Sequence, residues 1–202
     1  MTETKKAEES LLIRNARLSY AYLFKPYEAD DGKKSWTSHL IIDTTHPQLS
    51  AIDARIRAVA KEQWKDKSDE VLKALKAQDR LCIHRGDVSK VGQAPYAGKL
   101  YISASNSIQP RILATIDGIN QEIGPDSEYA PYSGCYANAT VIIWAQDNKF
   151  GKRINAQLTG VQFLRHSERL SGGGRAASLD EFGPVKSEGA DADAPSASEG
   201  LV

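Results

Sequence analysis

Alternation of apolar and polar residues is most regular from Ser133 to His166, where it predicts two long strands joined by a short connection. Successive side chains along a strand point to opposite faces. The first strand therefore has a core face of small residues: Cys135, Ala137, Ala139, Val141, Ile143 and Ala145. Its other face mixes aromatic rings, Tyr136 and Trp144 among them, with amides and hydroxyls.

The second strand of this hairpin is predicted to be mostly apolar on one face and polar on the other. The apolar face comprises Ile154, Ala156, Leu158, Gly160, Gln162 and Leu164. The opposite face comprises Arg153, Asn155, Gln157, Thr159, Val161, Phe163 and Arg165.

The connection between the two strands, Asp147–Lys152, is expected to expose positive charge around one aromatic ring: Lys149, Phe150, Lys152 and Arg153. Such a tip suits a phosphate chain that bears stackable bases. The same composition also fits a solvated hairpin whose lysines only prevent edge-to-edge aggregation. The hairpin by itself leaves both interpretations open.

Apolar residues also predict a first strand from Leu11 to Phe24, whose two faces are not cleanly separated, which indicates a bulge or a bend. Basic and aromatic side chains interleave along it: Arg14, Arg17, Tyr20, Tyr22 and Phe24. This combination is typical of a stacking surface for single-stranded nucleic acid. The alternative for each of the three rings is a place in the core.

A polar loop, Pro26–Lys34, precedes a second predicted strand, Ser35–Asp43, with Trp36 near its start beside Lys33 and Lys34. Helical spacing then replaces alternation. One helix is predicted after Pro47, and its apolar face consists of Leu49, Ile52, Ile56, Val59, Ala60 and Trp64. A second, shorter helix capped by Ser68 presents Val71, Leu72 and Leu75.

The middle of the chain is predicted to alternate strands and loops. Short strands are expected at 81–84, 99–105 and 110–116, separated by loops at 85–97 and 117–131. Tyr101 is placed beside Lys99 on a polar strand face, Lys90 lies in the first loop, and Arg111 opens the last strand. These are further candidates for contacts with bases and phosphates.

Charge is unevenly distributed, although the 202 residues sum to zero formal charge. Residues 179–202 contain six acidic residues and one lysine, a charge of −5, so residues 1–178 carry +5. We therefore predict a polar, disordered N-terminus at 1–10, one domain at 11–170, and a flexible Gly-rich linker with an acidic tail at 171–202. A basic body suits an anionic partner.

Signatures of catalysis, cofactor binding and membrane insertion are missing from the sequence. It has no phosphate-binding loop, dinucleotide fingerprint or nucleophile elbow. Cys82 and Cys135 give no disulfide framework, and with His84 they make a poor metal site. The N-terminus does not resemble a signal peptide, and no apolar run is long enough for a membrane helix. We expect a cytosolic, non-enzymatic protein without metal or cofactor.

Several short motifs in a fixed order resemble a family of bacteriophage single-stranded DNA-binding proteins long catalogued as a domain of unknown function. They are Asn15-Ala16-Arg17-Leu18-Ser19-Tyr20, the strand 36–42, Tyr129-x-x-Tyr132-Ser133-Gly134-Cys135-Tyr136, Gly151-Lys152-Arg153-Ile154, Leu158-x-x-Val161-Gln162, and the Gly-rich segment with Phe182. The resemblance covers roughly residues 11–182.

This resemblance implies a mainly β fold, an OB-fold-like five-stranded barrel with a helical insertion and a disordered acidic tail. It also implies sequence-nonspecific binding of single-stranded DNA in phage replication or recombination, inside the bacterial host cytoplasm. The tail would regulate binding or recruit replication or recombination proteins. The predicted helices follow the second strand, whereas the usual barrel helix follows the third.

The candidate binding residues divide by chemistry. Those expected to stack on bases are Tyr20, Tyr22, Trp36, Tyr101, Tyr136, Trp144 and Phe150. Those expected to meet phosphates are Arg14, Arg17, Lys33, Lys34, Lys90, Lys99, Arg111, Lys149, Lys152 and Arg153. The main alternative is a non-enzymatic phage module whose basic loops bind an acidic protein. A nuclease would need a metal held by clustered carboxylates, with Asp87 or Asp147 as candidates.

Overall fold

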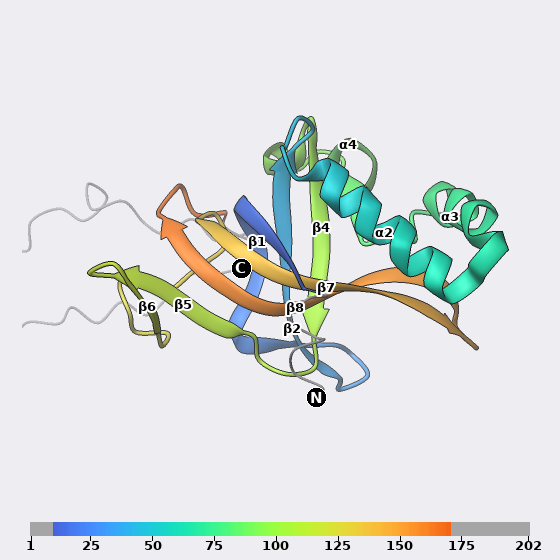
Figure 1. The fold of residues 1–202 in the computed structure, drawn as a ribbon. Coiled ribbons are helices and arrows are strands. Elements are labelled where there is room, and N and C mark those ends of the chain that lie inside the picture. Colours follow the sequence, from blue (N-terminus) through green and yellow to red (C-terminus); the bar gives the residue numbers. More distant parts are fainter. Residues whose placement is uncertain (1–9, 171–202) are drawn as a thin grey trace, which may run out of the picture. The chain divides into compact units, whose positions relative to one another are not determined.

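Five strands close into a barrel in residues 10–170, the part of the chain that this computed structural model describes (Figure 1). The strands are β1 (Ser10–Glu28), β2 (Lys34–Asp43), β4 (Lys99–Asn106), β7 (Tyr136–Asn148) and β8 (Gly151–Arg165). The expectations for the N-terminal residues 1–9 and for the linker and acidic tail at 171–202 lie outside the described residues.

Strand pairing confirms the predicted OB-like barrel. Neighbouring strands are antiparallel in the order β4-β2-β1-β7-β8, and β8 returns to β4 as a parallel neighbour through Ala104↔Ala156 and Ser105↔Gln157. Three shorter strands extend the sheet: β3 (Ile83–Arg85) on β4, β5 (Arg111–Ile116) on β8, and β6 (Ile119–Glu122) on β5. The barrel itself thus has no open edge.

The bend predicted in the first strand is present. Asn15 and Tyr20 have φ values of 51° and 49°, in the left-handed region that few non-glycine residues adopt. The pairing register of β1 shifts at each of these points. Because of the bends, the first half of β1 pairs with β7 and the second half pairs with β2.

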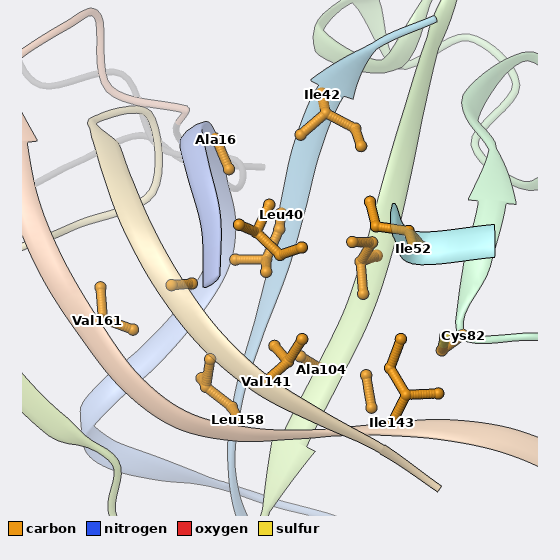
Figure 2. Close-up of a cluster of buried hydrophobic side chains, with 14 of the residues drawn as sticks. Ala16, Leu40, Ile42, Ile52, Cys82, Ala104, Val141, Ile143, Leu158 and Val161 are labelled. Carbon is orange, nitrogen blue, oxygen red and sulfur yellow. The ribbon is translucent and has the colours of Figure 1, made fainter. Parts of the chain in front are cut away.

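The hairpin formed by β7 and β8 supplies much of the core, as its alternation predicted. From Cys135, which directly precedes β7, to Ile143, every second side chain is at most 1% exposed. Figure 2 shows Val141 and Ile143 in the same buried cluster as Leu158 of β8 and Leu40 of β2.

The predicted faces of β8 are correct only up to Leu158. Beyond it Val161 and Phe163 are buried, 1% and 7% exposed, while Leu164 is exposed, so the predicted assignment of these residues was wrong. A bulge is the cause: Val141 pairs with Leu158 and Thr140 with Gly160, which leaves Thr159 as the extra residue. One extra residue exchanges the two faces of the strand that follows.

The helical insertion joins the second barrel strand to the third, as the sequence indicated. It consists of α2 (Leu49–Trp64), a 3-10 turn (Lys65–Lys67) and α3 (Ser68–Ala77). The apolar face of α2 packs into the barrel core, and Figure 2 shows Ile52 in the same buried cluster as Leu40 and Val141. Ser68 opens α3 but does not cap it, since the N-cap position is Lys67.

Some elements were not predicted. β6 lies within the predicted loop 117–131, and α4 (Gly86–Ser89) and a 3-10 turn (Ala94–Tyr96) lie within the predicted loop 85–97. The β7–β8 connection is a two-residue turn, Lys149 and Phe150, because both strands extend further than their alternation indicated.

We predict that Gly134→Ala destabilises the barrel by about 2–4 kcal/mol. Gly134 has φ +118°, and a Cβ there would lie 2.1 Å from the carbonyl oxygen of Glu168. Gly124→Ala is the matched control, because an added Cβ meets nothing within 4 Å there. Denaturant unfolding measures both variants, and equal stability of the two would contradict the prediction.

Candidate nucleic-acid interface

The outer surface of β1, β2 and β4 gathers three of the seven aromatic candidates: Tyr20, Tyr22 and Tyr101. Leu40 and Ile102 face the core, so the residues that alternate with them face outward. Pairing places the outward residues in rows across the strands: Tyr22, Thr37 and Ser105 in one, and Ser19, His39 and Ser103 in another. In the OB fold this is the face of strands 2 and 3, which binds oligonucleotides.

One half of this face is open. We define the open half by Tyr22, Tyr27, Ser35, Thr37 and Ser105. Tyr22 and Tyr27 are 38% and 44% exposed, and their rings meet edge to face with centroids 5.3 Å apart. Two exposed rings beside hydroxyl groups form a surface on which bases can stack while the hydroxyls contact sugar or phosphate.

The other half is covered by the segment 86–98. Tyr96 of this segment is 1% exposed, and its hydroxyl lies 2.8 Å from Nδ1 of His39. Tyr101 is 4% exposed, because His39 and His84 stack against its ring at centroid distances of 4.7 and 4.9 Å. The expectation that Tyr101 offers an exposed ring was therefore wrong.

Tyr20 lies where the two halves meet. It is 41% exposed, and its ring contacts His39 at a centroid distance of 4.9 Å. Nζ of Lys90 lies 4.7 Å from the centroid of the ring, and the Tyr20 hydroxyl donates to Oε1 of Gln93 at 3.3 Å. The sequence proposed Tyr20 and Lys90 separately, and the fold brings them together in a cation–π contact.

Burial governs ionisation under the covering segment. Burial lowers the pKa of His39 to about 4, with smaller contributions from the positive charge of Lys90 and from His84. Burial also raises the pKa of Tyr96 to about 12. His39 is therefore neutral near pH 7, and the cluster is held by ring packing and hydrogen bonding.

Several basic candidates bind groups of the protein itself. Arg17 donates to the backbone carbonyls of Gly134 and Glu168 at 3.1 Å each, which gives it a structural role. Arg111 pairs with Glu122 at 2.6 Å across the β5–β6 hairpin, and Lys99 pairs with Asp43.

The cations of the β1–β2 loop also have acidic neighbours. Lys33 pairs with Asp31, and this contact lowers the pKa of the Asp31 carboxyl. Lys34 pairs with Glu28 at 3.5 Å. Both pairs are well exposed, and exposed ion pairs contribute little free energy. A phosphate can therefore replace either carboxylate at small cost.

The tip of the β7–β8 hairpin holds a second aromatic and basic group. Phe150 is 71% exposed, with Nζ of Lys149 5.1 Å from its ring centroid. Trp144 is 42% exposed. It pairs with Asn155, and Arg153 pairs with Gln146, so Trp144 and Arg153 lie on the same face of the hairpin. Lys152 instead contacts Asp147 and the ring of Trp64.

The remaining candidates do not join either group. The guanidinium of Arg165 covers the ring of Tyr136 at 3.8 Å, at the end of β7 away from the hairpin tip. Trp36 lies on the core-facing side of β2 and is half-buried, and its indole N–H has no partner among the described residues. Arg14 is exposed near the start of β1, where its backbone N–H donates to Gln48.

Sequence reasoning missed Tyr27, which it assigned to a loop, and His39, which it left unassigned. Proline at position 26 indicated a loop, whereas β1 continues through it to Glu28. The signal that could have identified Tyr27 is its aromatic character in a segment that already contained Tyr20 and Tyr22.

Within 10–170, no three His, Cys, Asp or Glu side chains are grouped so that they could hold a metal ion. No helix in that range combines the length and the apolar character that crossing a membrane requires.

Comparison with known proteins gives consistent matches. The family model described as "Enterobacter phage Enc34, ssDNA-binding protein" matches residues 9–194. "Putative protein p50" of Acyrthosiphon pisum secondary endosymbiont phage 1 is 35% identical over 176 residues, which cover 84% of this chain and 90% of that protein.

Two solved structures share the fold. The single-stranded DNA-binding protein from bacteriophage Enc34, in complex with ssDNA, is 28% identical with a TM-score of 0.68, over 81% of this chain and 90% of that one. Gp2.5 of bacteriophage T7, also a single-stranded DNA-binding protein, has a TM-score of 0.52 at 12% identity, over 85% of this chain and 99% of that one. The second likeness is one of fold alone.

We predict that His39 makes the protein less stable in acid. Its folded-state pKa of about 4 lies below its ordinary value of 6.5, so on acidification the unfolded chain takes up this proton first. The contribution of neutral His39 to the free energy of unfolding is fully present above pH 6.5. It is lost as the pH falls towards 4, which lowers the free energy of unfolding by about 3 kcal/mol. Urea unfolding across this range should show a shallower pH dependence in His39→Gln, and identical slopes would contradict the prediction.

Proposed function

This chain belongs to the family of the Enterobacter phage Enc34 ssDNA-binding protein, and from that premise we propose that it binds single-stranded DNA with little sequence preference. The observation that carries the proposal is the similarity, over most of both chains, to an Enc34 protein solved with ssDNA bound. The open half and the hairpin tip are the two places on this barrel whose chemistry suits that ligand.

Stacking supplies the nonspecific part of the affinity in this proposal. Tyr22 and Tyr27 offer exposed ring faces, and each stacked base contributes about 1–3 kcal/mol without base-specific hydrogen bonds. Thr37 and Ser105 lie in the same row as Tyr22 and contact the sugar–phosphate chain. Tyr20, which already contacts His39 and Lys90, stacks at the border of the covered half.

Phosphate contacts come from the two loops that flank this face in an OB barrel. Here they are the β1–β2 loop, with Lys33 and Lys34, and the β7–β8 tip, with Lys149 and Arg153. Trp144 and Phe150 extend the stacking surface at the tip. If roughly five phosphates are neutralised, log K falls against log salt concentration with a slope of roughly −3.5.

Fluorescence anisotropy of a labelled oligo-dT strand, at two salt concentrations and with a duplex of equal length as competitor, tests the proposed function. We expect binding that weakens with salt and that the duplex does not displace. Equal affinity for the duplex would remove stacking from the mechanism. Absence of binding at low salt would reject the proposed function.

Removing both exposed rings should weaken binding. We predict that Tyr22→Ala combined with Tyr27→Ala lowers the affinity for oligo-dT about 30-fold or more, the sum of two weak stacking contributions. The double Phe variant is the matched control, since it keeps both rings and removes only the hydroxyls. An unchanged affinity in the double Ala variant, with its fold verified by circular dichroism, would place the DNA elsewhere.

We further propose, from charge alone, that the acidic tail competes with DNA and recruits other proteins. Residues 179–202 carry a charge of −5 on the same chain as the barrel, and a competitor on the same chain acts at high effective concentration. Deleting 179–202 should therefore tighten oligo-dT binding at low salt, measured by the same anisotropy assay. If truncation leaves the affinity unchanged at low salt, the tail does not compete.

In this proposal the protein acts by coating and protecting single strands, not by catalysis. Its setting is phage DNA replication or recombination in the cytoplasm of the bacterial host. The family assignment favours binding over nuclease chemistry.

A further inference from the structure

A groove of about 860 Å³ lies between the helical insertion and the short edge strand β3, outside the surfaces assigned to DNA. Its lining comes from α2, α3, the residues just before β3, β3, α4 and the start of β4. The floor is aliphatic and consists of Leu49, Ile52, Ile56, Leu72, Leu81, Ile83 and Leu100. A volume of this size is typical of a ligand site.

The floor is incompletely covered because α3 packs on its neighbours through a narrow contact. Leu75 is the one residue of α3 that is buried, at 3% exposed, and Leu72 beside it remains partly exposed. Leu81 and Ile83 are also only partly buried. Val88, on the rim, is 66% exposed. A continuous apolar patch rimmed by polar residues marks an interaction site.

The rim of the groove carries four cations and three carboxylates, an excess of one positive charge. Asp53 is paired with Arg57 at 2.7 Å, and Asp79 accepts hydrogen bonds from Ser89 and contacts His84, each at 2.8 Å. No ion pair to a described residue engages the other rim cations, which are exposed: Lys73, Lys76 and Arg85. Asp69 is the one further acid on the rim.

We propose that this groove binds a short acidic, amphipathic segment of another protein. Aliphatic side chains of that segment would fill the floor, and its carboxylates would face Lys73, Lys76 and Arg85. Two helices in the walls favour a helical ligand with apolar anchors at positions i, i+3 or i+4, and i+7. The charge excess selects an acidic partner over a basic one.

The same features argue against DNA as the occupant. No tyrosine, tryptophan or phenylalanine lines the groove, and the His84 ring is stacked on Tyr101. Bases stack on aromatic faces, which this aliphatic floor lacks. The groove therefore gives the protein a docking site for a partner that is separate from its DNA surface.

A synthetic peptide tests the proposal on the full-length protein. The probe is an acidic helical peptide about four turns long, with Leu and Phe at the anchor positions and Glu between them. A scrambled peptide of identical composition destroys the apolar face and serves as the ligand control. Amide chemical shifts in ¹⁵N NMR spectra report where each peptide binds, and fluorescence anisotropy gives the affinity.

Charge reversal on the rim supplies the protein variants. We expect Lys73→Glu with Lys76→Glu to weaken peptide binding about tenfold or more, from the loss and reversal of two attractive charges. Lys61→Glu with Lys67→Glu makes the same charge change on exposed residues of the insertion that do not line the groove, and should leave peptide affinity within about twofold. Both variants should bind oligo-dT like the unmodified protein, which separates this test from the test of DNA binding.

The docking site would be supported by peptide-induced shifts at Leu72, Ile83, Val88 and Leu100, together with weaker peptide binding in the rim variant and nearly unchanged binding in the control variant. Equal binding of the scrambled peptide, shifts elsewhere, or no shifts would overturn the proposal. Loss of oligo-dT affinity in the Lys73→Glu, Lys76→Glu variant would show that DNA uses this groove. Concentration-dependent shifts at the groove without peptide would identify a second copy of the chain as its occupant, and would also overturn it.

Discussion

Closure of the barrel rests on the parallel contact between β4 and β8, where Ala104 pairs with Ala156 and Ser105 with Gln157. The methyl side chains of the two alanines are buried inside the barrel, next to the small residues of β7. Larger residues there would crowd a close-packed interior and hold the strands apart. Once the ring is closed, strand alternation determines which side chains leave the core. Tyr22, Thr37 and Ser105 thus reach one outer row as a consequence of core packing.

The outer face has two chemically distinct halves because a local segment covers one of them. Tyr96 and the two histidines enclose Tyr101, so that ring stabilises the fold and has no free face for a base. Stacking capacity is concentrated on Tyr22 and Tyr27, whose rings already support one another edge to face. The covered half borders the open half at Tyr20, whose ring contacts His39. The groove between the helical insertion and β3 is the proposed docking site for a protein.

Most strands could be predicted from the sequence, because alternation is a local property and the core of β7 is unusually regular. The faces of β8 beyond Leu158 could not be predicted, because the bulge at Thr159 arises from the way β8 pairs with β7 near Thr140. The Asp117-Gly118 turn of the β5–β6 hairpin was predictable, because Asp-Gly is a strong hairpin signal, although the sequence analysis assigned it to a loop. In the structure both residues have positive φ, as such a turn requires. Among the candidate residues, Tyr22 and Phe150 are exposed, although the sequence left a core position open for Tyr22. The burial of Tyr101 and the carbonyl contacts of Arg17 arise from segments distant in sequence.

Photocross-linking with an oligonucleotide that contains 5-iodo-deoxyuridine, followed by mass spectrometry of the linked peptides, tests the central claim most directly. Halogenated bases cross-link efficiently to aromatic rings on which they stack. The account predicts linkage to Tyr22 or Tyr27 of the open half, with weaker linkage to Trp144 or Phe150. Linkage confined to Tyr129, Tyr132 or Tyr136, with none on β1, would contradict it and place the DNA on another face of the barrel.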